Sequence, residues 1–529
     1  MHGLNAGRWL VVMFGLALAC AASAAPPADL DRYAARVMQT FETPGMAVAI
    51  VEQGKPGVVR TYGVKRMGET AKVDEHSLFA IGSTTKAFTA ALLAMLVDEG
   101  KLTWDTKVSD VLPGFKMYDP YATSEMTVRD LLVHRSGLGL GAGDLLFYPP
   151  TTLSSADIVQ RLRYIKPATS FRSAYAYDNL LYVVAGQVIE AVTQSSWHDA
   201  MRQRILKPLG MNDTSTFSDV PAGVNRAWPH LRMSEVARGI GPIGPLDKPT
   251  VLDNSAAAGS LNASGADVVR WLELQLSRGL DPRTNTRLFS EAQSKEMWTP
   301  QTLIPVAPAP KGMELTQANF RAYALGWGTS DYRGERILAH GGGVPGFVCT
   351  FVVVPNRNVA FAVLTNAEES GTLASMQNRL LDHYLGVKSP DWITVISNNQ
   401  KERVAKAREV LTTKTSSNEP VKGPSLPLDK YAGRYRDAWY GPISIETAGP
   451  GMRIRFENTP TMKGTLEHVR YDTFRTHWED RAIEDAYVTF ALNPDGSIER
   501  MTMKAISPLA DFSFDYHDLL FTPEASSRQ

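Results

Sequence analysis

The chain is 529 residues long and 44% hydrophobic, so it can bury sizeable cores, and its length predicts two or three folded units. Its 55 basic and 55 acidic residues cancel to a formal net charge of zero. This balance argues against a nucleic-acid-binding protein or one held on an anionic membrane, and it favours a small or neutral partner.

Residues 1–25 have the pattern of a cleaved export signal. Arg8 precedes the apolar run WLVVMFGLALACAA, and the small residues ASAA follow where a signal peptidase would cut. The apolar run is shorter than the ~20 residues of a membrane span. We therefore expect a periplasmic or secreted protein with no transmembrane segment in the mature chain. Lipid attachment at Cys20 is the alternative, because LALAC loosely resembles a lipoprotein site.

The first predicted elements after the signal are a helix and two strands. Apolar residues recur at helical spacing over 28–41. After a Pro-Gly break, residues 46–55 and 57–64 have the pattern of two strands joined by a turn. Residues 84–96 are rich in Ala, Leu and Met and contain no Gly or Pro, which predicts a buried helix that ends at Gly100.

Further helices and strands follow along the chain. Their order, with strands at both ends and helices between them, predicts an α/β domain over residues 26–400. In it an antiparallel sheet would be sandwiched by helices beside an α-rich lobe. The predicted helices cover 127–137, 179–193 and 264–279, and the predicted strands cover 336–342, 346–355 and 359–366.

The C-terminal part changes character. A polar helix and a linker rich in Thr, Ser and Pro are predicted over 401–426. Stretches that alternate polar and apolar residues then predict a small all-β, barrel-like domain over 427–522. The sequence Asn-Pro-Asp-Gly at 493–496 is a hairpin signal within it.

Cysteine usage argues against disulfides and thiol chemistry. If Cys20 leaves with the signal, Cys349 is the only remaining cysteine, so no internal disulfide can form. Cys349 lies in the apolar stretch GFVCTFVVVP, where we expect a buried and inert thiol.

Ser83 and Lys86 stand at the start of the predicted helix 84–96. Residues three apart lie on one face of a helix, so the hydroxyl and the amine can approach each other. An apolar pocket disfavours the charged form of a lysine, and its neutral amine can then take the proton of the serine. In the structural alternative, Ser83 caps the helix and Lys86 extends to water. Ser-x-x-Lys arises by chance roughly once or twice in a chain this long, so the motif needs support from elsewhere.

Two downstream motifs supply that support. Tyr177-Asp178-Asn179 stands directly before a predicted helix, and His340 precedes three glycines at the end of a predicted strand. With the flanking stretches LLVHRSGL and LGWG, the order Ser-x-x-Lys, Tyr-x-Asn, His-Gly-Gly resembles the serine hydrolases that comprise class C β-lactamases, D,D-peptidases of the penicillin-binding-protein type and their esterase relatives. The resemblance spans about residues 44–369.

The resemblance implies catalytic roles for four side chains. Ser83 would be the acylating nucleophile and Lys86 its proton acceptor. Tyr177 would be the second acid and base, which requires a cationic neighbour such as Lys86 to lower its pKa from near 10. Asn179 would hydrogen-bond both the substrate amide and Lys86.

The same resemblance places the substrate along the strand that carries His340. Gly341, Gly342 and Gly343 would let a substrate backbone approach, with the Gly343 N–H joining that of Ser83 in an oxyanion hole. In the plainer alternative these glycines only make a turn. Many relatives have lysine where His340 stands. Since histidine is mostly neutral at pH 7, recognition of a free carboxylate is in doubt, and internal or N-terminal peptide bonds or esters are favoured.

No cofactor or metal is predicted. The segment GLGLGAG at 137–143 is spelled like a dinucleotide-binding loop, yet no strand precedes it and no helix clearly follows. No zinc pattern such as His-Glu-x-x-His is present.

These patterns predict an exported serine hydrolase that forms an acyl-enzyme. The resemblance implies short or linear peptides as substrates, including those with D-amino acids, because relatives with a C-terminal β-barrel of this kind act on such bonds. The layout is also similar to that of the bacterial peptidase that cleaves linearised microcystin. A carboxylesterase or β-lactamase of the same fold is one alternative. A non-catalytic scaffold that binds peptides or a partner is another. The oligomeric state and the role of the β-domain stay open.

Overall fold

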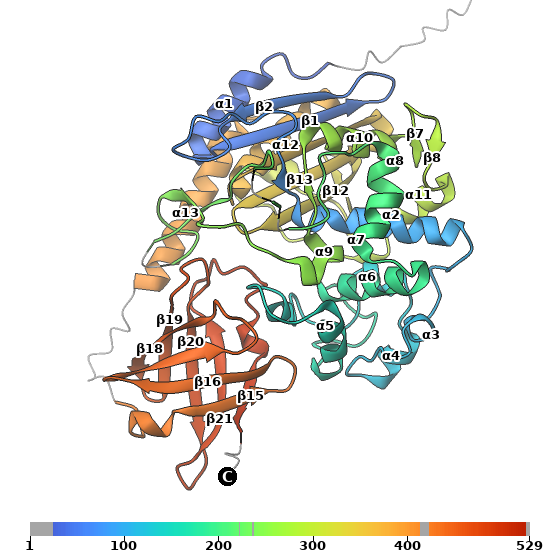
Figure 1. Cartoon of the computed structure of the whole chain (residues 1–529). Coiled ribbons are helices and arrows are strands. Elements are labelled where there is room, and N and C mark those ends of the chain that lie inside the picture. The colour runs from blue at the N-terminus through green and yellow to red at the C-terminus, as the bar shows by residue number, and fades with distance from the viewer. Residues whose placement is uncertain (1–24, 219, 222, 235–236, 413–422, 525–529) are drawn as a thin grey trace, which may run out of the picture.

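The computed structural model describes residues 25–218, 220–221, 223–234, 237–412 and 423–524, which form an α/β domain and a β-barrel (Figure 1). The predicted signal peptide up to residue 24, Cys20 included, and residues 413–422 of the predicted linker lie outside these ranges. Within the described ranges, no helix combines the length and apolar character that crossing a membrane requires.

An eight-stranded sheet forms the centre of the α/β domain, and its order joins the two ends of the domain. β1 pairs antiparallel with β14, with Met46 opposite Thr365, so the first and last strands meet as predicted. The order across the sheet is β2-β1-β14-β13-β12-β11-β10-β9. The strands are β1 (Gly45–Glu52), β2 (Val58–Gly63), β9 (Thr302–Leu303), β10 (Arg321–Tyr323), β11 (Gly328–Tyr332), β12 (Glu335–Val344), β13 (Phe347–Val354) and β14 (Val359–Thr365).

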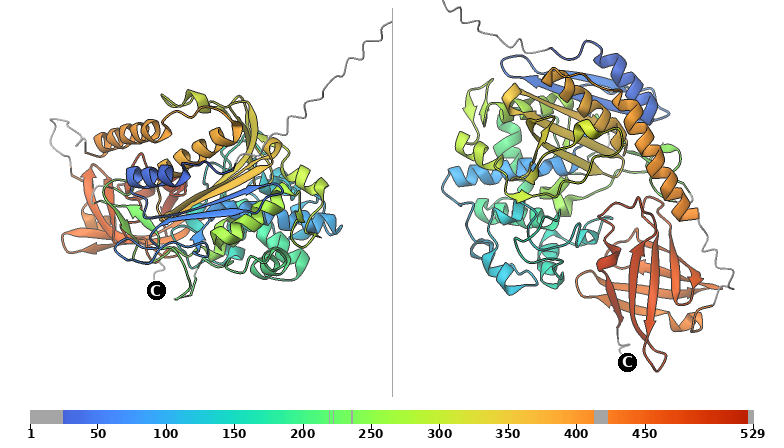
Figure 2. Two further views of the ribbon diagram at one scale, coloured as in Figure 1. Left: turned by 90° about the horizontal axis from the view of Figure 1, so that it is seen from above. Right: turned by 180° about the vertical axis from the view of Figure 1, so that it is seen from behind.

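Helices cover both faces of this sheet, which explains why β1 and β14 are buried along their whole lengths. Alternate residues of β1 enter two different cores: Val48 packs with the core beneath α1 (Leu30–Phe41), α12 (Ser370–Leu385) and α13 (Trp392–Thr412). Ala49, one residue on, enters the core on the opposite face. Figure 2 shows α12 and α13 lying over one side of the sheet.

The helical lobe is inserted between β2 and β9. Its longest members are the apolar helices α2 (Thr85–Asp98) and α6 (Leu180–Thr193), and α10 (Gly265–Leu276) packs on the sheet. The shorter elements of this region are α3 (Val108–Val111), α4 (Pro120–Glu125), α5 (Ser155–Arg161), α7 (Trp197–Met201), α8 (Lys207–Leu209), α9 (Ala256–Gly259), α11 (Glu291–Met297), β3 (Phe79–Ala80), β4 (His230–Arg232), β5 (Ile243–Pro245), β6 (Asn262–Ala263), β7 (Leu280–Asp281) and β8 (Thr286–Arg287).

One predicted helix is wrong. Residues 127–137 form only a short 3-10 turn at Asp130–Leu132. The Asp130 carboxylate accepts hydrogen bonds from the Thr127 N–H and hydroxyl and from Arg135, which closes the segment locally. His134 then adopts φ +54, a left-handed conformation that ends any helix. Farther along, α13 begins at Trp392 and therefore crosses the predicted boundary at residue 400.

The C-terminal domain is a closed eight-stranded antiparallel barrel, as the alternating pattern predicts. Met452, Ile454 and Phe456 of β17 point inward between exposed arginines. The hairpin signal at 493–496 joins β20 to β21. The strands are β15 (Gly433–Asp437), β16 (Gly441–Ala448), β17 (Gly451–Phe456), β18 (Lys463–Arg470), β19 (Thr473–Trp478), β20 (Ala486–Leu492), β21 (Ile498–Ala505) and β22 (Leu520–Pro523).

Candidate active site

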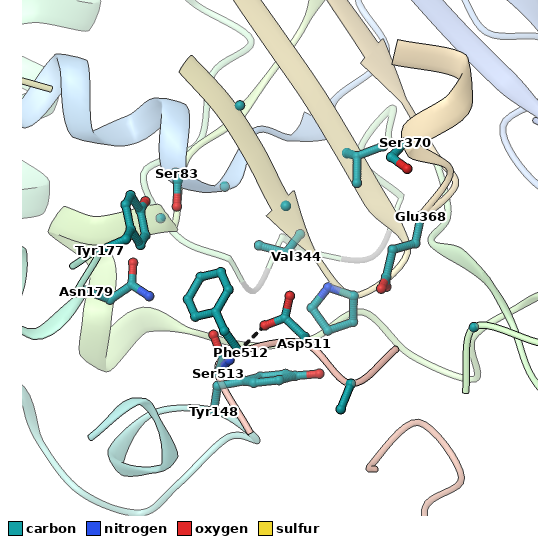
Figure 3. Close-up of a pocket in the computed structure, with 18 of the residues that line it drawn as sticks. Ser83, Tyr148, Tyr177, Asn179, Val344, Glu368, Ser370, Asp511, Phe512 and Ser513 are labelled. Carbon is teal, nitrogen blue, oxygen red and sulfur yellow. Dashed lines mark hydrogen bonds between the residues drawn. The ribbon is translucent and has the colours of Figure 1, made fainter. Parts of the chain in front are cut away.

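Ser83 lies in a tight turn that is pressed against strand β12. The turn, Gly82–Thr84, leads directly into α2. Gly82 has φ +48, and a Cβ at this position would lie 2.8 Å from the main-chain nitrogen of Gly343. The turn therefore requires glycine before the serine, and this close approach holds Ser83 beside the strand edge at one end of a cleft (Figure 3).

Lys86 is buried in the first turn of α2 with its amine directed at Ser83. Its Nζ lies 2.9 Å from Ser83 Oγ, 2.7 Å from Asn179 Oδ1 and 2.9 Å from the main-chain oxygen of Ala258. The side chain is wholly buried, so the alternative in which Lys86 extends to water is wrong. Burial lowers the pKa of Lys86 to about 7, against an opposing influence of Asp144. A large neutral fraction near pH 7 can therefore accept the serine proton.

Tyr177 faces Ser83 from the segment that precedes α6 (Figure 3). Its hydroxyl oxygen is buried and has no well-formed hydrogen bond to any described residue. Burial raises the pKa of Tyr177 well above its usual value, and the Ser83 hydroxyl offsets this only in part. The lowering of the Tyr177 pKa that a base role would require is not found, and Lys86, the cation expected to cause it, loses its own charge near pH 7. Tyr177 is thus a protonated phenol near pH 7, and the neutral amine of Lys86 is a group that can accept a proton.

Asn179 joins Lys86 to a buried carboxyl group. It stands at the N-terminus of α6 and lines the cleft. Its Oδ1 accepts the hydrogen bond from Lys86, and its Nδ2 donates to Asp144 Oδ2 over 2.8 Å. The predicted contact to Lys86 is present, and the second amide hydrogen remains for a substrate carbonyl.

His340 is a neutral ring whose two nitrogens are both engaged within the protein. Nδ1 lies 2.6 Å from the Gly341 oxygen, which can only accept, so Nδ1 carries the proton. Nε2 then accepts from the Tyr323 hydroxyl over 2.6 Å. Burial lowers the pKa of His340 to about 3. His340 is therefore neutral near pH 7, in line with the expectation from its usual pKa.

The three glycines of β12 divide between the two faces of the strand. Gly341 and Gly343 line the cleft, and Gly343 has open space where a side chain would stand. Gly342 faces the opposite way, and a Cβ there would lie 1.9 Å from the Ile81 oxygen. The prediction that Gly342 contacts substrate is corrected to a packing role. Gly343 keeps its predicted place beside Ser83.

We expect Gly342→Ala to lower the free energy of unfolding by about 2 kcal/mol or more, because the added methyl overlaps the Ile81 backbone and the Cys349 sulfur. Gly343→Ala is the matched control, since its methyl would meet open space. Denaturant unfolding of both variants measures the difference. Equal stabilities would contradict the packing role of Gly342.

The cleft has a volume of about 780 Å³ and a wall that the sequence did not indicate. Residues 508–513 of the C-terminal domain line it, with the Phe512 ring 5.8 Å from the Tyr177 ring. Tyr148, Arg238 and Glu368 line the far end. Among the described residues, no group of three or more His, Cys, Asp or Glu side chains is arranged to hold a metal ion. Cys349 is buried on β13, and burial raises the pKa of its thiol to about 12, as an inert thiol requires.

Comparison with protein families gives two matches along the chain. The family model for β-lactamase matches residues 30–385, and that for a domain of unknown function, DUF3471, matches residues 417–523. The unguisins hydrolase ungD' of Aspergillus campestris is 31% identical over 447 residues, which cover 79% of this chain and 78% of the relative. Penicillin-binding protein 4 of Amycolatopsis lactamdurans is 30% identical over 363 residues, which cover 66% and 87%.

Solved structures share the fold at lower identity. The octameric penicillin-binding protein homologue from Pyrococcus abyssi superposes with a TM-score of 0.56 at 19% identity, covering 93% of this chain and 99% of that one. The D-amino acid amidase from Ochrobactrum anthropi SV3 gives 0.54 at 21% identity, covering 70% and 99%. At these identities the likeness shows the fold alone.

Proposed function

The chain belongs to the β-lactamase family of penicillin-binding-protein-like serine hydrolases, and from this membership we propose that it is an exported peptidase that works through an acyl-enzyme at Ser83. One observation carries the proposal. The buried amine of Lys86 lies 2.9 Å from Ser83 Oγ at the edge of an open cleft, and burial lowers the pKa of Lys86 to about 7. A neutral amine in this position can activate the serine hydroxyl as a nucleophile.

The proposed reaction begins with acylation. Ser83 Oγ attacks the substrate carbonyl as its proton passes to the neutral amine of Lys86. The resulting oxyanion is stabilised by the N–H groups of Ser83 and Gly343. Tyr177 donates its phenolic proton to the leaving nitrogen, the carbon–nitrogen bond breaks, and Lys86 returns a proton to Tyr177.

Deacylation reverses these transfers with water in place of the amine. Water attacks the ester carbonyl, and its proton passes to Ser83 Oγ through Tyr177 and Lys86 as the carbon–oxygen bond breaks. The products are a carboxylic acid and an amine, and the enzyme returns to its starting state.

The cleft suits a peptide of a few residues. Its volume, about 780 Å³, falls in the range of sites for ligands of that size. The Phe512 ring offers an apolar wall near Ser83, and Arg238, Glu368 and Asp511 provide both signs of charge farther along. The neutral His340 has no charge with which to attract a substrate carboxylate. Substrates that contain D-amino acids are proposed from the resemblance of the Ser-x-x-Lys, Tyr-x-Asn and His-Gly-Gly motifs to those of the D,D-peptidases.

The proposal includes two more specific candidate substrates. The relative named as an unguisins hydrolase, at 31% identity, supports unguisins or related compounds as candidate substrates. Linearised microcystin is a further candidate through the similar layout of the chain. Export is proposed from the signal-like pattern of residues 1–25.

A mixed library of L- and D-peptides, analysed by mass spectrometry, tests the proposal. We expect cleavage products from the full-length protein and none with Ser83→Ala, since that variant lacks the hydroxyl that Lys86 activates. Nitrocefin and p-nitrophenyl esters are assayed in parallel. Rapid turnover of nitrocefin without peptide cleavage would overturn the peptidase proposal in favour of a β-lactamase, and ester turnover alone would favour an esterase.

Covalent labelling separates an enzyme from a non-catalytic scaffold. A fluorophosphonate should label the wild-type chain at Ser83 and should not label Ser83→Ala. Retained peptide binding without labelling of either chain would support the scaffold alternative.

A further inference from the structure

A loop of the barrel domain enters the active-site cleft. This barrel loop, residues 506–515, follows β21 and ends before the 3-10 turn Tyr516–Asp518. Its Phe512 lies beside Tyr177, and Ser513 and Asp515 are buried against the α/β domain. Figure 3 shows Phe512 and Ser513 beneath Tyr177 and Asn179. The loop therefore reaches the catalytic side chains.

The glycine-rich segment 137–143 is shaped to receive this loop. Gly141 has φ +69, and a Cβ there would lie 2.7 Å from the main-chain oxygen of Phe512. The N–H groups of Gly143 and Leu145 donate to the Asp515 carboxylate over 2.6 and 3.2 Å. Residues 137–143, whose glycine pattern resembles that of a dinucleotide-binding loop, thus form a docking site for the barrel loop.

A continuous series of hydrogen bonds runs from the barrel loop to the nucleophile. The Ser513 hydroxyl donates to Asp144 Oδ2 over 2.7 Å. Asn179 Nδ2 donates to the same oxygen over 2.8 Å, and its Oδ1 accepts from Lys86 over 2.7 Å. Lys86 is in turn 2.9 Å from Ser83 Oγ. The side chains that link the barrel loop to Ser83 are fully or largely buried, so water does not compete for their bonds.

This series of bonds controls the orientation of Asn179. A carboxamide can present either its oxygen or its nitrogen to a neighbour. Asp144 Oδ2 also accepts from Ser513, so it draws the Nδ2 end of Asn179 and leaves Oδ1 for Lys86. Without this acceptor the amide would be free to rotate, and the lysine amine would lose one of its three partners.

Asp144 also acts on the charge of Lys86. An anionic carboxylate in a buried site favours the ammonium form of Lys86, as does Asp178. The charge of Lys86 also contributes to lowering the pKa values of His134 and His340, after burial, which is the main cause. Burial raises the pKa of Asp144 to about 7, and the charge of Asp511 in the barrel loop adds to this rise, whereas the hydrogen bonds from Ser513 and Asn179 and the charge of Lys86 favour the carboxylate.

We propose that Asp144 and Ser513 are positioning residues of the hydrolase reaction, which act through Asn179 to set the geometry and protonation of Lys86 and so make the barrel a part of the catalytic apparatus. This inference rests on the proposed function, because it requires acylation at Ser83. The barrel then contributes to the chemical step in addition to forming one wall of the cleft.

The test measures the rate of fluorophosphonate labelling of Ser83 against pH in the full-length chain, which requires no knowledge of the natural substrate. Asp144→Asn keeps an oxygen acceptor and removes the charge, so the acid limb of the profile should move to lower pH. Ser513→Ala should slow labelling roughly five- to tenfold through loss of one buried hydrogen bond, and Ser513→Thr should restore it. Ser497→Ala, at an exposed hairpin of the same barrel, is the matched control and should behave as wild type.

The outcomes separate three cases. A merely structural role would lower thermal stability without moving the pH limb, and that result for Asp144→Asn would overturn the inference. A labelled wild type with both variants unchanged in rate and profile would also overturn it while leaving the proposed function intact. Absence of labelling in the wild type would overturn the proposed function and the inference together.

Discussion

Lys86→Met is expected to lower kcat/KM for a peptide substrate by about a thousandfold to ten-thousandfold. Methionine fills a similar volume in the buried site, so the fold should be kept, whereas the group that accepts the Ser83 proton is lost. Assay of peptide cleavage with matched protein concentrations measures the loss. Lys406→Met, which alters an exposed lysine on α13, is the control and should leave the rate unchanged.

The wild-type pH profile provides the second half of this prediction. Burial lowers the pKa of Lys86 to about 7, and the reaction requires its neutral form. Activity should therefore be low in acid, where Lys86 is charged, and should rise through about pH 7 to a plateau. This acid limb should be absent from the residual activity of Lys86→Met. A wild-type limb near the ordinary lysine pKa would contradict the lowered pKa of Lys86, and a variant of near wild-type activity would show that Lys86 is not the base.

The main elements of the fold follow from local patterns. The apolar runs that became β1, β13 and β14 are buried on both faces, and such strands are recognisable without knowledge of their partners. The helix predicted at 127–137 is wrong because the structure of this segment depends on a contact with a distant residue. Its apolar spacing is helical, but the Asp130 carboxylate accepts hydrogen bonds from Arg135 and also from Arg172, which lies 42 residues away in the sequence. The contact with Arg172 cannot be read from the local pattern. The helix α12 was not among the predicted elements.

For the candidate catalytic residues, too, some features were predictable from the sequence and others depend on the whole fold. Ser83 lies in the turn that leads into α2 and Lys86 lies three residues on in the first turn of that helix, so their contact was predictable from spacing. The placement of Asn179 next to Lys86 came from the resemblance to a known family. The state of Tyr177 was not predictable, because its pKa depends on burial by groups from several parts of the chain. The same holds for Ser513, which lies 369 residues from Asp144 in sequence and 2.7 Å from it in space.

Tyr177→Phe should separate the two halves of the proposed chemistry. We expect peptide hydrolysis to fall by roughly a hundredfold to a thousandfold, because an amine leaves poorly without a proton from the Tyr177 phenol. Acylation by a p-nitrophenyl ester should fall much less, because nitrophenolate leaves as a stable anion and Lys86 still activates Ser83. The burst of nitrophenol from the variant measures acylation apart from later steps.

The contrast between the two substrates identifies the base. If Tyr177 were the base for Ser83, its loss would reduce ester and amide acylation alike, and the burst would disappear. A phenol whose pKa is raised by burial instead holds its proton until a basic leaving nitrogen forms beside it, and the resulting phenolate takes a proton back readily. Equal losses for the ester and the peptide would therefore contradict the assignment of Lys86 as base and Tyr177 as acid. Tyr182→Phe is the matched control and should not discriminate between the substrates, because the Tyr182 hydroxyl donates to the Leu132 oxygen away from Ser83.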